Sequence, residues 1–85
     1  MKDLAKRLGA LVRISYPYEV RSVDVRATKN KIYVNVEYAP LHESMKAYVD
    51  NGVSVVIENI MVRHDMVCEW HSKGNGDHSY IYAMA

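Results

Sequence analysis

The chain has 85 residues, with eleven Lys or Arg, ten Asp or Glu and a net charge of +1. This length excludes two ordinary domains, and we expect one domain over residues 1–85. The near-zero charge argues against a strongly basic nucleic-acid binder and against an acidic mimic of nucleic acid. A hydrophobic content of 49% excludes a disordered chain.

The single cysteine cannot form an internal disulfide, which is typical of a reducing compartment. The first residues are charged and amphipathic and lack the continuous apolar segment of a secretory signal. No run approaches the roughly 18 apolar residues of a membrane span. We therefore expect a cytoplasmic protein that does not bind membranes.

Residues 3–13 predict the first helix. Asp3 suits its N-terminal cap, and Pro17 follows its end. The apolar side chains recur at helical spacing on one face: Leu4, Leu8, Leu11 and Val12.

Residues 20–27 and 31–38 predict an antiparallel hairpin, because apolar and polar residues alternate on both sides of a polar loop. One register satisfies every position. Its apolar face pairs Ala27 with Ile32, Val25 with Val34 and Val23 with Val36. Its polar face pairs Arg26 with Tyr33, Asp24 with Asn35 and Ser22 with Glu37.

Residues 41–50 predict a short second helix, with Pro40 before it and Gly52 as a left-handed stop after it. The sequence contains no Phe, and Tyr38 and Tyr48, which lie on apolar faces, are expected to take its place in the core. The β-branched residues that follow favour a strand over 53–58. Helical spacing of the apolar residues over 53–64 leaves a helix there as an open alternative.

Residues 65–71 and 78–84 predict a second hairpin around Asn75-Gly76, a favoured two-residue turn. This turn pairs Trp70 with Ile81, Cys68 with Ala83, His71 with Tyr80 and Glu69 with Tyr82. A register shifted by two residues, which pairs His71 with His78, is an alternative. In both registers the Cys68, Trp70 and Ile81 side is expected in the core.

Together these segments predict an α+β fold in the order α-β-β-α-β-β-β. Two hairpins and a middle strand form a small antiparallel sheet, and two short helices pack on one of its faces.

The second hairpin has an expected outward face that collects side chains suited to protein contact. These candidate partner-binding residues are Glu69, His71, His78, Tyr80 and Tyr82. A His pair beside a Tyr and a carboxylate is also the set of groups used by a metal-independent ribonuclease, with His71 and His78 as acid and base.

The first hairpin suggests a second alternative, a weak nucleic-acid-binding module. Its basic and aromatic side chains could hold phosphates and stack on bases: Arg21, Arg26, Lys29, Lys31 and Tyr33. No metal or cofactor is expected, because His64, Cys68, His71 and His78 lack the spacing of a zinc site in a strand.

We expect a small, non-enzymatic binding or regulatory protein that acts through Tyr-rich sheet faces. Domains of this kind occur among accessory proteins of viruses and mobile elements. The expected partner is another protein or a second copy of the chain, and nucleic acid is a weaker expectation.

Overall fold

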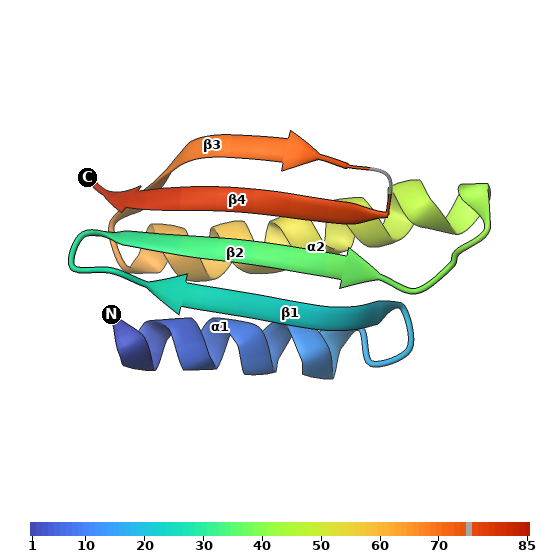
Figure 1. The fold of residues 1–85 in the computed structure, drawn as a ribbon, viewed down its shortest axis with the longest axis horizontal. Coiled ribbons are helices and arrows are strands. Elements are labelled where there is room, and N and C mark those ends of the chain that lie inside the picture. Colours follow the sequence, from blue (N-terminus) through green and yellow to red (C-terminus); the bar gives the residue numbers. More distant parts are fainter. Residues whose placement is uncertain (75) are drawn as a thin grey trace.

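The computed structural model describes residues 1–74 and 76–85, which form two helices and four strands (Figure 1). The elements are α1 (Lys2–Ser15), β1 (Val20–Ala27), β2 (Lys31–Tyr38), α2 (Glu43–Arg63), β3 (Met66–Lys73) and β4 (Asp77–Met84). The strands form one antiparallel sheet in the order β1-β2-β4-β3. The predicted α+β fold class is therefore confirmed, with the observed order α-β-β-α-β-β.

The β1–β2 hairpin has the predicted bounds and the predicted register. Ala27 lies opposite Ile32, Val25 opposite Val34 and Val23 opposite Val36. The alternation of apolar and polar residues determined this pairing, because a shift by one residue would move the valine side chains of one strand from the core face to the solvent face.

The core lies between the sheet and the two helices, which cover the same face. Apolar side chains from α1, α2 and all four strands form one buried cluster. The α2 residues in it recur every fourth position: Val49, Val53, Ile57 and Met61. This spacing places them on one side of the helix, toward the sheet.

The strand predicted over 53–58 is wrong, because these residues belong to the middle of α2. The expected stop at Gly52 is wrong for the same reason. Gly52 lies inside the helix, beneath the side chain of Tyr16 from the end of α1. The helical spacing of the apolar residues thus overrides their β-branched chemistry and the turn-forming residues before them.

The first two turns of α2 are mostly exposed. Tyr48, expected in the core, has 70% of its surface exposed, whereas Val49 beside it is fully buried. No helix in the described part of the chain has the length and apolar character needed to cross a membrane.

The β3–β4 hairpin keeps the predicted pairing of Trp70 with Ile81 and of His71 with Tyr80. The alternative register, with His71 opposite His78, is wrong. Between Cys68 and Trp70 the register shifts, so that Cys68 pairs with Tyr82 instead of Ala83 and Glu69 occupies a bulge. The predicted turn contains Asn75, which lies outside the described residues.

Candidate functional site

The tyrosines of β4 face the helices. His78, Tyr80 and Tyr82 expose only 4%, 3% and 2% of their surfaces, so the expectation that they lie on an outward face is wrong. The two tyrosine hydroxyls have partners on α2 that compensate for burial. The Tyr80 hydroxyl lies 2.9 Å from Ser54 Oγ, and the Tyr82 hydroxyl donates to Glu58 Oε2 over 2.7 Å.

Burial raises the pKa of the Tyr80 and Tyr82 hydroxyls above the ordinary value. For Tyr82, the hydrogen bond to Glu58 raises the pKa further, because the ionised hydroxyl would face a carboxylate. These groups hold the sheet against α2.

The other two predicted partner-binding residues, His71 and Glu69, lie on opposite faces of the sheet. His71 is exposed beside the helices and stacks on Tyr80, with ring centroids 4.3 Å apart. Glu69 lies in the bulge, and its carboxylate receives Lys31 Nζ over 2.9 Å. The predicted patch is thus not one continuous surface.

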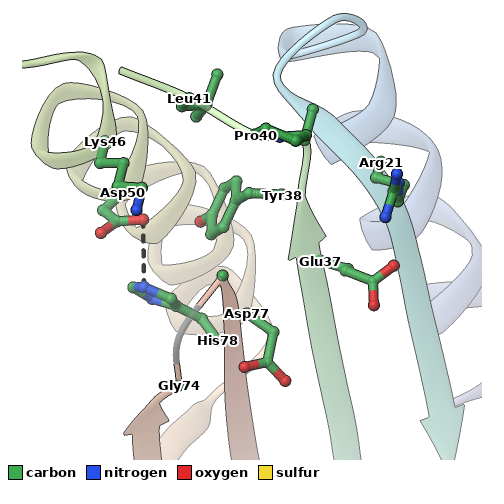
Figure 2. Close-up of a pocket in the computed structure, with 12 residues that line it drawn as sticks. Arg21, Glu37, Tyr38, Pro40, Leu41, Lys46, Asp50, Gly74, Asp77 and His78 are labelled. Carbon is green, nitrogen blue, oxygen red and sulfur yellow. Dashed lines mark ion pairs between the residues drawn. The ribbon is translucent and has the colours of Figure 1, made fainter. Parts of the chain in front are cut away.

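A cavity of about 640 Å³ opens at the end of the sheet beside the start of α2 (Figure 2). His78 Nε2 lies 3.2 Å from Asp50 Oδ1 there, and Tyr38 projects toward Asp50 in the same view. The Tyr38 hydroxyl and His78 Nδ1 are buried without a hydrogen-bond partner among the described residues. Burial raises the pKa of the Tyr38 hydroxyl, and the nearby charges of Tyr80 and Asp50 add to this shift.

Sequence reasoning missed this cluster because it placed Tyr38 in the core and Asp50 at a helix end. The ring centroids of His71 and His78 lie 5.5 Å apart, but His78 is buried, so the two imidazoles do not both face solvent. Partial burial lowers the pKa of His71, and His78 and Lys73 lower it further. No group of three or more potential metal ligands gathers among the described residues.

The basic residues of the first hairpin do not gather into one patch. Lys31 is paired with Glu69, and Lys29 lies in the hairpin loop beyond β1. Arg21 is at the other end of β1, where it lines the cavity. Only Arg26 and Tyr33 are direct cross-strand neighbours.

The face of the sheet opposite the helices carries a row of four large side chains that crosses all four strands. Arg26 of β1 lies opposite Tyr33 of β2, Tyr33 opposite Ile81 of β4, and Ile81 opposite Trp70 of β3. We call these four residues the outer row. Trp70 exposes 48% of its surface, Arg26 is exposed, and Tyr33 and Ile81 are half-buried.

The placement of Trp70 and Ile81 in the core is therefore wrong, although their pairing is right. Cys68, also expected in the core, is exposed. The neighbouring positions toward the β3–β4 turn are small and polar: Asp24, Asn35, Ser79 and Ser72. This contrast makes the outer row the most aromatic part of the open face.

Comparison of the chain with known proteins finds no matching family model and no matching curated protein.

Proposed function

We propose that this protein is a non-enzymatic binding protein that contacts a protein partner through the open face of its sheet. The observation that supports this proposal is the outer row. Trp, Tyr and Arg are enriched among the residues that dominate the binding energy of protein interfaces, because the aromatic rings provide a large contact area and the guanidinium both donates several hydrogen bonds and stacks on rings. Here one residue of each type lies in a single line on a face that neither helix covers.

The surroundings of the outer row suit such a contact. Val67, on the same strand as Trp70, exposes 55% of its surface and adds apolar area. The Lys31–Glu69 ion pair lies beside it at the rim. An apolar centre with a polar rim is typical of protein interfaces.

The two alternatives have less support. A nucleic-acid module would need its cations on one surface, whereas Arg21 and Lys29 lie at opposite ends of the first hairpin. A ribonuclease would need a substrate phosphate between its acid and base, whereas His71 and His78 lie side by side and His78 is buried.

The test compares three tagged proteins: the wild type, Trp70→Ser and Val55→Ser. Val55 is the matched control because it exposes 56% of its surface on α2, on the side of the sheet opposite the open face. Each protein is incubated with a nuclease-treated lysate of the source cells. We expect the wild type and Val55→Ser to retain the same proteins, and Trp70→Ser to lose them by roughly tenfold or more.

Equal retention by all three proteins would contradict a contact at Trp70. A second arm without nuclease separates the alternative. Retention that is lost both in Trp70→Ser and on nuclease treatment would assign the open face to nucleic acid.

A further inference from the structure

The order of residues along the outer row is self-complementary. The row runs Arg26, Tyr33, Ile81, Trp70 from β1 to β3. When a second, reversed row is laid over it, each Arg meets a Trp and each Tyr meets an Ile. A guanidinium over an indole face is a favourable cation–π pair, and Tyr against Ile buries apolar surface from water.

We propose that the partner of the open face is a second copy of this chain, bound face to face about a two-fold axis that runs along the strands. This inference rests on the proposed function of the open face and identifies its occupant. A two-fold contact uses the same patch on both molecules, so each favourable pair occurs twice. The contact contains two Arg26–Trp70 pairs at its ends and two Tyr33–Ile81 pairs at its centre.

The positive charge of Arg26 fits this orientation. Arg26 makes no ion pair with any described residue, so its guanidinium is free to leave water for an indole. Glu37 and Asp77 lie on the same face as the row but about 13 Å further along the strands. The proposed axis brings Glu37 of one molecule toward Asp77 of the other, which opposes the contact. The crossing of packed sheets at about 30° separates these carboxylates at the rim, where salt screens them.

The open face also has room for the contact. A shallow depression of about 140 Å³ lies on it, bordered by Arg26, Tyr33, Trp70 and Ile81. The four strands offer a flat area of about 500 Å². This area is smaller than the roughly 800 Å² per partner of a standard interface, so we expect a weak dimer with a Kd in the micromolar range.

Sedimentation equilibrium tests the proposal on the purified chain, from about 1 to 500 μM. We expect the apparent mass to rise with concentration from 9.7 kDa toward twice that value. Trp70 is the only tryptophan, so its emission should shift to shorter wavelength over the same concentrations. A monomer at every concentration would overturn the proposal.

An exchange of residues tests the pairing itself. Trp70→Arg alone places Arg against Arg, and the repulsion between the two guanidinium groups should weaken association at least tenfold. Arg26→Trp alone places Trp against Trp, an aromatic pair that keeps apolar contact, so it should weaken association less. The double variant Arg26→Trp, Trp70→Arg restores both pairs and should return to within about threefold of the wild type. A double variant that stays as weak as Trp70→Arg would overturn the proposed orientation.

Two controls keep the result interpretable. Val55→Ser should dimerise like the wild type, and circular dichroism should show that every variant is folded. If the wild type is monomeric in sedimentation, self-association is disproved. The proposed function still stands if the wild type retains a foreign protein from the lysate and Trp70→Ser does not. A dimer that is unaffected by changes at Arg26 and Trp70 would contradict the proposed pairing of the open faces, and the binding test with Trp70→Ser would then decide the proposed function separately.

Discussion

The Tyr16 side chain, at the C-terminal end of α1, lies against the backbone of Gly52 in the middle of α2. A Cβ added at Gly52 would overlap the Tyr16 hydroxyl and ring. The two helices approach each other closely here because residue 52 has no side chain.

We expect Gly52→Ala to lower the free energy of unfolding by about 1–3 kcal/mol, because displacing the Tyr16 ring costs more than the roughly 1 kcal/mol of helix propensity that Ala gains. Gly9→Ala in α1 is the matched control. Its Cβ would lie 3.6 Å from Val25 Cγ2, an ordinary contact, so better helix propensity should raise the free energy of unfolding by up to about 1 kcal/mol. Urea denaturation measures both. A Gly52→Ala variant as stable as Gly9→Ala would contradict the Tyr16 contact.

The contact between Asp50 Oδ1 and His78 Nε2 should stabilise the N-terminal half of α2 on the sheet. Asp50→Ala leaves the His78 Nε2 donor buried without a partner, and we expect a loss of about 1–3 kcal/mol in the free energy of unfolding. Glu69→Ala breaks the exposed pair with Lys31 and should cost less, because water solvates the freed ammonium. Urea denaturation compares the two variants, and an equal loss in both would argue against a special role for Asp50.

The buried tyrosines should ionise late in alkali. The pKa values of Tyr38, Tyr80 and Tyr82 are raised above the ordinary value near 10. Their contribution to stability is present below pH 10 and is lost as the pH rises above it, because the unfolded chain releases these protons first.

We therefore expect the tyrosinate absorbance of the native protein at about pH 10.5 to fall short of that of the urea-unfolded chain. The remainder should appear together with unfolding. Tyr82→Phe should reduce this late fraction. A native titration that superimposes on the unfolded one would contradict the buried hydroxyls.

The imidazole of His71 should make stability depend on pH. Its folded pKa lies below the ordinary value of 6.5 because of partial burial and the charges of His78 and Lys73, which outweigh the opposite effect of Asp50. The unfolded chain thus binds this proton more readily. The contribution of neutral His71 is complete above about pH 6.5 and decreases as the pH falls through the folded pKa.

We expect the wild type to lose more stability than His71→Gln between about pH 7.5 and pH 5.5. Urea denaturation at both pH values measures the difference. Parallel losses in the two proteins would show that other groups account for the acid dependence.

Sequence pattern predicted the bounds of the first hairpin and its register from Ser22–Glu37 to the turn, because valines on one face and charges on the other leave a single register. The irregularity between Val20 and Ser22 was not predicted. For the second hairpin, the sequence did not indicate which face is buried. Its strands carry large side chains on both faces, so alternation defined the two faces without showing which one is buried. Trp70 and Ile81 are the more apolar pair, yet Tyr80 and Tyr82 occupy the core.

The prediction assigned the wrong face of the second hairpin to the core because it missed the second half of α2. Ser54 and Glu58, the hydrogen-bond partners of Tyr80 and Tyr82, lie on the part of α2 that was predicted to be a strand. Without that helix, burying two hydroxyls had no visible compensation. The same error placed Trp70 in the core, so the outer row was not predicted as an exposed feature.

The bulge at Glu69 opposes aggregation through the exposed edge of β3. β3 is an edge strand, and an uninterrupted edge with exposed Val67 and Trp70 would invite other chains to extend the sheet into fibres. The extra residue breaks the even spacing of backbone donors and acceptors halfway along this edge. Edge-to-edge growth is thereby opposed, while the flat face beside it stays open to a specific contact.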